Sequence, residues 1–183
     1  MRINFFGGPG VGKSTLAALT FGWLRARGES AELVQEWVKA WAYLGRQCRS
    51  FDEVFVLANQ MHAEDQFFQA GVKLVVTDSP LYLQCVYALR RKMKVANDLW
   101  KIATRFEEAY PSINFIVDRD PDVAYEQAGR YENLNDAVAM DRLMTTCLRD
   151  WNIPVTHVKP SDLDSVLKVI SKQLAAPKGR KKK

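Results

Sequence analysis

The sequence predicts an α/β domain in which helices flank a five-stranded parallel sheet in three layers. Strand-like hydrophobic segments alternate with helix-like segments along the 183 residues, as in parallel sheets with crossover helices. The segment 72–78 (VKLVVTD) is rich in β-branched residues, which is typical of a strand buried on both faces. A glycine-rich turn separates the first strand-like segment from the first helix-like one. Together these features favour a single domain over residues 1–176.

The individual elements follow from hydrophobic spacing. Strands are predicted at the segments 3–8, 30–35, 72–78, 113–119 and 154–158. Helices are predicted at the segments 13–28, 36–46, 50–71, 81–93, 98–110, 135–151 and 161–175. Two of these helices are expected to end at Gly28 and Gly71, and two others to begin at Ser50 or Asp52 and at Ser161.

The composition argues against several classes of protein. Three widely spaced cysteines and two histidines favour neither a disulfide framework nor a zinc site. No apolar run approaches the roughly 20 residues of a membrane span. The chain begins directly with a strand-like segment, so we expect a cytoplasmic protein with no membrane association and no obligate protein partner.

The net charge of +5 is concentrated in the last seven residues, PKGRKKK, which carry five positive charges. We expect this tail, residues 177–183, to be disordered. It is interpreted either as a solvated chain end or as a basic arm that binds a polyanion.

Residues 7–14, GGPGVGKS, match the pattern G-x-x-x-x-G-K-S/T, with a hydrophobic strand before it and a helix after it. In this pattern, backbone N–H groups surround the β-phosphate, and glycines let the backbone approach closely. Lys13 is expected to contact the β- and γ-phosphates, and Ser14 to offer its hydroxyl to Mg²⁺. The sequence therefore predicts a P-loop NTPase fold of the nucleotide-kinase type, with ATP held by Gly8, Gly10, Val11, Gly12, Lys13, Ser14 and Thr15.

The rest of the chain narrows the choice among P-loop proteins. The guanine-reading pattern N/T-K-x-D is missing, which counts against a GTPase. Asp78 ends the third predicted strand and is followed by Ser79, without the second acidic residue of a translocating ATPase. Asp78 is therefore predicted to bind the metal, and capping of the next helix is the alternative role.

The segment after the second strand has residues suited to an acceptor site. Glu36 is placed to accept a proton from an attacking hydroxyl, or else simply favours a helix start. We expect one aromatic ring of Trp37, Trp41 and Tyr43 to face the cleft. Arg46 and Arg49 are candidates for an acceptor phosphate or a DNA backbone.

The charged segment 119–135 is predicted to be a lid that closes over ATP, and an exposed loop is the alternative. Its candidate residues are Arg119 for the nucleotide, Arg130 for the transferring phosphoryl group and Gly129 as a hinge. Arg142, in the following helix, is a further candidate.

Over roughly residues 1–150, the chain resembles the phage-encoded P-loop ATPase/kinase-like family. The resemblance lies in four segments and their order: GGPGVGKST, ELVQEWVKAW, VVTDSPLYLQCVY and VDRDPDVAYEQAGRYEN. Within it, the sequence looks most like the DNA 5-hydroxymethyluridine kinases, which phosphorylate a base hydroxymethyl group in DNA during thymine hypermodification. The resemblance implies ATP and Mg²⁺ at Lys13 and Ser14, a metal or acceptor role for Asp78, and a lid role for Arg130. Deoxynucleoside kinases carry an arginine at the position of Ser79, so a free nucleoside is the less expected acceptor.

The leading hypothesis is ATP-dependent phosphorylation of a hydroxyl in DNA that contains 5-hydroxymethyluridine. Glu36 or Asp78 would act as the base, and Lys13 and the lid arginines would stabilise the developing charge. The acceptor base would have to leave the duplex to reach the site. The alternatives are a deoxynucleoside monophosphate kinase, which takes a free nucleotide, and a regulatory P-loop ATPase without a phosphoryl acceptor.

Overall fold

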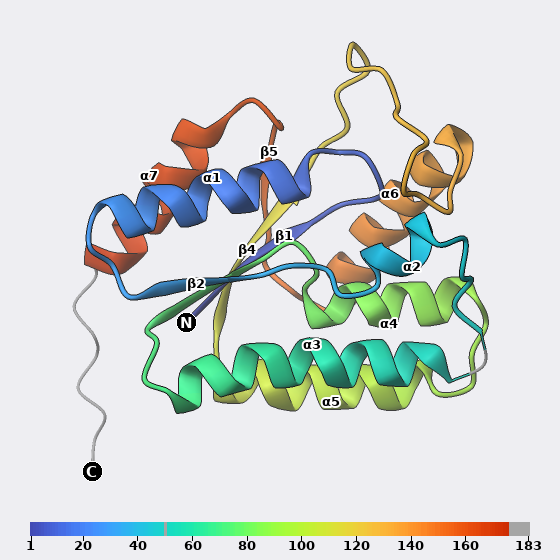
Figure 1. The fold of residues 1–183 in the computed structure, drawn as a ribbon, viewed down its shortest axis with the longest axis horizontal. Helices are drawn as coiled ribbons and strands as arrows, with labels where there is room; N and C mark the ends of the chain where they lie inside the picture. The colour runs from blue at the N-terminus through green and yellow to red at the C-terminus, as the bar shows by residue number, and fades with distance from the viewer. Residues whose placement is uncertain (50, 176–183) are drawn as a thin grey trace.

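The computed structural model describes residues 1–49 and 51–175, and these form the predicted five-stranded parallel sheet (Figure 1). The strands lie in the order β2-β3-β1-β4-β5, and each neighbouring pair is parallel. The strands are β1 Arg2–Phe6, β2 Ala31–Val34, β3 Leu74–Thr77, β4 Ser112–Val117 and β5 Thr156–Val158. The helices are α1 Lys13–Ala26, α2 Lys39–Tyr43, α3 Asp52–Gln69, α4 Leu81–Arg90, α5 Ala96–Ala109, α6 Leu134–Asp150 and α7 Leu163–Ala175. The predicted α/β fold class is confirmed.

Helices cover both faces of the sheet and give the fold three layers (Figure 1). Helices α1 and α7 enclose one apolar core, and helices α3, α4, α5 and α6 enclose the other. Strand β1 contributes to both cores because successive strand side chains point to opposite faces. Ile3 and Phe5 belong to the core under α1, whereas Phe6 belongs to the core under α4. Within the described ranges, no helix has both the length and the apolar character needed to cross a membrane.

The strand register places the site at the carboxyl edge of the sheet. Asn4 of β1 and Val34 of β2 both align with Thr77 of β3. The residues that follow these strands therefore emerge side by side, which brings Glu36 and Asp78 next to the loop after β1. Strand β1 is also where the chain order changes direction, since β3 flanks it on one side and β4 on the other. Open α/β sheets bind ligands at such a point.

The helix predicted at 36–46 is much shorter in the structure, where α2 spans only Lys39–Tyr43. At its start, the backbone N–H of Glu36 donates to Asp78 Oδ1 at 3.0 Å, which holds this residue at the sheet edge. At its end, Gly45 has a φ of 66°, in the left-handed region that ends helices. Gly28 and Gly71 follow α1 and α3 with φ of 76° and 85°, as the predicted helix ends require.

The predicted start of the last helix is wrong, whereas α3 does begin at Asp52, one of its two predicted starts. Asp162 rather than Ser161 caps α7, since its Oδ1 accepts the Ser165 N–H at 3.0 Å. Asp52 is the first residue of α3 rather than its cap, and its Oδ2 accepts the N–H of Arg49 at 2.8 Å. The alternative start at Ser50, the domain end at residue 176 and the basic tail at 177–183 lie outside the described residues.

A buried arginine connects the first strand to two helices at the edge of the sheet opposite the site. The side chain of Arg2 is 1% exposed, and it pairs with Glu64 of α3 at 3.5 Å and with Glu107 of α5. Its Nε donates to the carbonyl of Tyr110 at 2.8 Å. Burial raises the pKa of Glu64, and the charge of Arg2 opposes that shift.

We expect Arg2→Met to lower the free energy of unfolding by about 3–5 kcal/mol, because it leaves the Glu64 carboxylate buried without its cation. Urea denaturation measures the change. The loss should shrink as the pH falls, since protonation of Glu64 removes the uncompensated charge. The double variant Arg2→Met/Glu64→Gln should recover part of the stability. A loss below about 1 kcal/mol in the single variant would contradict this account.

Candidate active site

The loop of residues 7–12 requires glycine at two positions in particular. The backbone there is left-handed, and neighbouring groups lie too close for a side chain. Gly10 and Gly12 have φ of 79° and 94°, in the left-handed region. A Cβ on Gly10 would lie 2.8 Å from the Tyr125 ring, and a Cβ on Gly12 would lie 2.9 Å from Pro160. Gly12 directly precedes α1, so the loop amides and the positive end of the helix dipole act on one anion site.

Lys13, the first residue of α1, lies back over this loop. Its Nζ donates to the carbonyl of Gly8 at 2.8 Å. Burial lowers the pKa of Lys13, and the nearby carboxylates of Glu36 and Asp78 oppose that shift. A cation that has lost its water in this way is favourably placed to bind an anionic ligand.

Ser14 and Asp78 form a pair of oxygen donors next to Lys13. The hydroxyl of Ser14 donates to Asp78 Oδ2, and the other oxygen of Asp78 accepts the Glu36 N–H. Asp78 is 3% exposed, so these two contacts fix its orientation. Mg²⁺ in phosphate sites is usually held by one or two protein groups together with phosphate and water oxygens. The Ser14–Asp78 pair fits such a metal.

The segment between β4 and α6, the predicted lid, contacts the loop. Arg119 donates from Nη2 to the carbonyl of Pro9 at 2.7 Å. The Tyr125 ring lies within cation–π range of two arginines, 5.7 Å from Arg119 Cζ and 5.2 Å from Arg130 Cζ. Among the described residues, the buried Nη1 of Arg130 has no hydrogen-bond partner and lies 3.9 Å from Glu126. A phosphate oxygen would satisfy this donor.

Asp141 of α6 is a site residue that the sequence analysis missed. Its Oδ1 accepts the N–H of Gly8 at 2.8 Å, and its Oδ2 accepts from Arg119 Nε at 2.6 Å. It thereby joins the loop, the lid and α6. No local signal marks it, because Asp141 lies in the middle of an amphipathic helix and meets its partners only through the tertiary fold.

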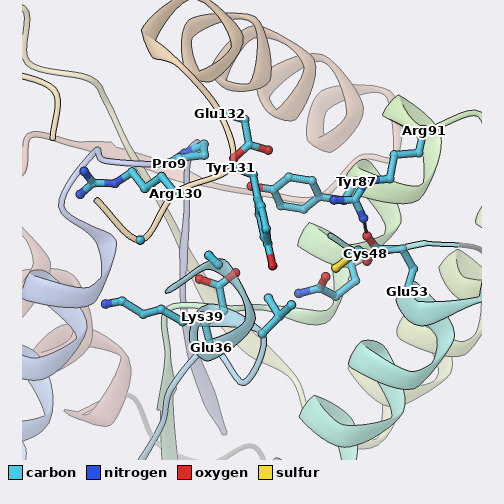
Figure 2. Close-up of a pocket in the computed structure, with 14 residues that line it drawn as sticks. Pro9, Glu36, Lys39, Cys48, Glu53, Tyr87, Arg91, Arg130, Tyr131 and Glu132 are labelled. Atoms are coloured by element: carbon cyan, nitrogen blue, oxygen red, sulfur yellow. Dashed lines mark ion pairs between the residues drawn. The ribbon is translucent and has the colours of Figure 1, made fainter. Parts of the chain in front are cut away.

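Three cavities surround the loop. The first, the phosphate cavity, has a volume of about 220 Å³ and is lined by the loop, the start of α1 and lid residues 126 and 128–130. The second, the inner cavity, has a volume of about 70 Å³ and lies between α2, α4 and the lid (Figure 2). The third, the outer cavity, has a volume of about 330 Å³ and is lined by residues 10–12 and by apolar side chains that include Val123, Leu134 and Pro160.

Glu36 lines both the phosphate cavity and the inner cavity, as do Lys39 and Arg130. In Figure 2 the Glu36 carboxylate lies between Lys39 and the ring of Tyr131. Burial raises the pKa of Glu36, and Lys13 opposes the shift. A carboxylate with a raised pKa at the junction of two cavities has the chemistry of a general base.

The remaining polar groups of the inner cavity are largely paired or neutral. Glu53 is 3% exposed and forms an ion pair with Arg91 (Figure 2). Gln84 donates to the hydroxyl of Ser79 at 3.0 Å. Burial raises the pKa of Tyr87 well above its ordinary value, so its phenol stays protonated.

The ring of Tyr131 occupies the middle of the inner cavity (Figure 2). Its hydroxyl donates to the carbonyl of Arg46 at 2.5 Å. The cavity is therefore far smaller than the roughly 300–1,000 Å³ of typical ligand sites. A ligand of nucleobase size can enter only if Tyr131 and the lid move.

The structure brings together Lys13, Ser14, Glu36, Asp78, Arg119 and Arg130 around the loop, and Thr15 lines the phosphate cavity. Val11 lines the outer cavity, and of the three aromatic candidates Tyr43 lines the phosphate cavity. Arg142 is exposed on α6, and Arg46 lies over the Trp41 ring instead of in a cavity. Motif reasoning also missed the inner-cavity residues Glu53, Gln84, Tyr87, Tyr131 and Glu132. Arg91, which the sequence offered either as a candidate for an acceptor phosphate or as part of a solvated helix end, lines this cavity too.

The fold and the loop define a P-loop protein with a nucleotide-kinase-like architecture. A sequence model of the AAA domain matches residues 2–165, and the chain belongs to this family. The comparison with curated proteins found no match. A solved structure of deoxyadenosine kinase from M. mycoides, with product dCMP and a flexible dCDP bound, is similar with a TM-score of 0.55. The identity is 14%, over 95% of this chain and 98% of that chain, so the likeness concerns the fold alone.

Proposed function

We propose that the protein is an ATP-dependent kinase that transfers the γ-phosphate to a hydroxyl group. The observation that carries this proposal is the position of Glu36, which lines both the phosphate cavity and the inner cavity. A phosphoryl donor in the first cavity and an alcohol in the second would meet at this carboxylate. A hydrolytic ATPase has no need of the second cavity.

The donor would lie with its phosphates against residues 10–15 and its base in the outer cavity. Lys13 would leave the carbonyl of Gly8 to contact the β- and γ-phosphates, and Arg119 and Arg130 would contact them from the lid. Ser14 and Asp78 would hold Mg²⁺. When bound, the metal supplies positive charge to the β- and γ-phosphate oxygens and helps to align them.

Glu36 would accept the proton of the acceptor hydroxyl as its oxygen bonds to the γ-phosphorus. The bond from that phosphorus to the β–γ bridging oxygen breaks, and ADP leaves with the electron pair. Lys13 and Arg130 stabilise the charge that develops on the transferring group. Asp78 is a poorer base, because both of its oxygens already accept hydrogen bonds.

The charges of the inner cavity favour a neutral hydroxyl over a phosphate as the acceptor. Its two deep carboxylates, Glu53 and Glu132, are paired with Arg91 and, at 3.9 Å, with Arg90. The two other cations of its lining, Lys39 and Arg130, stand at the junction with the phosphate cavity. The depth of the cavity therefore offers a monophosphate no unpaired cation among the described residues, which favours a neutral hydroxyl. A nucleoside monophosphate kinase is the alternative that the acceptor comparison below tests.

The finer proposal for the acceptor is the 5-hydroxymethyl group of 5-hydroxymethyluridine in DNA. It rests on the sequence resemblance given above and on Ser79. Where deoxynucleoside kinases carry an arginine, this chain has a buried serine that accepts a hydrogen bond from Gln84. Lys13 and the lid arginines are then the cations that would act on the transferring group.

Incubation with ATP labelled at the γ-phosphate tests the proposal. The acceptors to compare are single-stranded DNA containing 5-hydroxymethyluridine, the same DNA with thymine, free 5-hydroxymethyl-2′-deoxyuridine and deoxynucleoside monophosphates. We expect label in the modified DNA. Label in the free nucleoside would support the kinase activity but would show that the acceptor is a nucleoside and not DNA. Label in a monophosphate, or only in inorganic phosphate, would overturn the proposal.

We expect Arg130→Ala to lower kcat by about 10²–10³-fold, because it removes a buried donor aimed at the transferring phosphoryl group. Arg130→Lys should recover only part of the rate, since an ammonium cannot reproduce the planar fork. Steady-state kinetics at saturating ATP measure both variants. The matched control is Arg142→Ala, an exposed arginine on α6, which should behave like the wild type. Equal rates for Arg130→Ala and the control would remove Arg130 from the mechanism.

A further inference from the structure

The chain between β2 and α3 exposes an unusual amount of aromatic surface. Trp37, Phe51 and Phe55 have exposed fractions of 42%, 66% and 48%. Trp37 and Phe55 have ring centroids 5.0 Å apart, and Phe51 precedes Phe55 by one helical turn, so these two rings share one face of α3. Contiguous exposed apolar surface on a soluble domain marks an interaction site.

Arginines accompany these rings. The guanidinium of Arg46 lies 3.4 Å from the centroid of Trp41, whose other stacking neighbour is Phe55 at 6.2 Å. Arg46 is 54% exposed and is only partly neutralised by Asp52, at 3.6 Å. Arg49 is exposed as well. We name the surface of Trp37, Phe51, Phe55, Arg46 and Arg49 the aromatic platform.

The platform is continuous with the inner cavity. Val38, Lys39, Ala42 and Cys48, which lie between Trp37 and Phe51 in the chain, form one wall of that cavity. The carbonyl of Arg46 accepts the hydroxyl of Tyr131, the ring that fills the cavity. One short segment therefore has its inner side at the proposed acceptor site and its outer side at the platform.

We propose that the aromatic platform binds a single-stranded polynucleotide, one residue of which enters the inner cavity. Bases would stack on the exposed rings, and the strand phosphates would contact Arg46 and Arg49. Exposed rings combined with cations suit a chain that alternates flat bases with negative charges, whereas an apolar protein partner would not require the arginines. This inference rests on the proposed function, because it assumes that the acceptor is part of a polymer.

Fluorescence anisotropy of a labelled 20-nucleotide single strand, with the full chain and without ATP, tests the platform directly. We expect Trp37→Ala/Phe51→Ala to raise the Kd by at least about tenfold, because each stacking ring contributes substantially to single-strand binding. Trp37→Phe, which keeps a ring, should stay close to the wild type. Arg49→Ala should reduce the slope of log Kd against log salt by about 0.7, the value for one lost phosphate contact. The matched controls on the opposite face of the sheet are Leu19→Ala and Arg25→Ala, both in α1 and both exposed.

Kinetics distinguish a failure of the platform from a failure of the proposed function. The double variant should raise KM for an oligonucleotide acceptor and leave kcat, and the KM for ATP, unchanged. If the double variant and the α1 controls bind the single-stranded DNA with equal Kd, the platform proposal is overturned and the proposed kinase function is unaffected. Binding that is lost in the double variant, in a protein that transfers no phosphate to any acceptor, would support the platform and overturn the kinase. A change in self-association instead of strand binding, measured by sedimentation, would show that a second copy of the chain occupies this surface and would overturn the proposal.

Discussion

Lys13→Ala is expected to lower kcat/KM for phosphate transfer by about 10³-fold or more while the fold remains intact. Lys13 is the cation next to the loop, and in the proposed reaction it would act on charge that develops in a site with little water, where one such contact is worth several kcal/mol. Its Nζ donates to the carbonyl of Gly8, and phosphate oxygens, which are better acceptors, would replace that contact.

The stability of this variant separates a functional role from a structural one. Burial lowers the pKa of Lys13, so the folded chain bears a cost for keeping this cation. Its removal should therefore leave the melting temperature unchanged or raise it. Lys73→Ala, an exposed lysine just before β3, serves as the control and should retain full activity. A Lys13→Ala enzyme within tenfold of the wild type would show that the phosphates bind elsewhere.

Glu36→Gln is expected to lower kcat by about 10²–10⁴-fold and to leave ATP binding intact, because it removes the proton acceptor and keeps the shape of the side chain. Calorimetric titration with ATP and single-turnover kinetics measure the two effects. Glu132→Gln is the matched control, since Glu132 lines the inner cavity but not the phosphate cavity. If Glu36→Gln turns over normally, Glu36 is not the base and Asp78 is the remaining candidate.

The pH profile gives an independent test of the same residue. A base must be ionised to accept a proton, so the rate should fall tenfold per pH unit below its pKa. Burial raises the pKa of Glu36, which moves this acid limb above the ordinary glutamate value of 4.5. The limb should disappear in Glu36→Gln. An acid limb that persists there would belong to another group.

Much of this site follows from local sequence. The loop needs only neighbouring residues, since glycines at fixed positions permit left-handed backbone and a strand and helix on either side supply the context. Asp78 and Glu36 could also be placed, because each follows a strand and parallel strands end at one edge of the sheet. Hydrophobic spacing likewise predicted the layers, since burial on one or two faces leaves a period in the sequence.

The rest depends on contacts between residues far apart in the chain. Asp141 reaches the loop across 133 positions, and Tyr131 reaches Arg46 across 85. The inner cavity is lined by residues of α2, α3, α4 and the lid, so no spacing pattern in the sequence predicts it. The sequence by itself thus determined a phosphate-binding loop on a parallel sheet, because these depend on backbone conformation and periodic burial. Only the tertiary structure decided which carboxylate lines two cavities, because that depends on how distant segments pack around it.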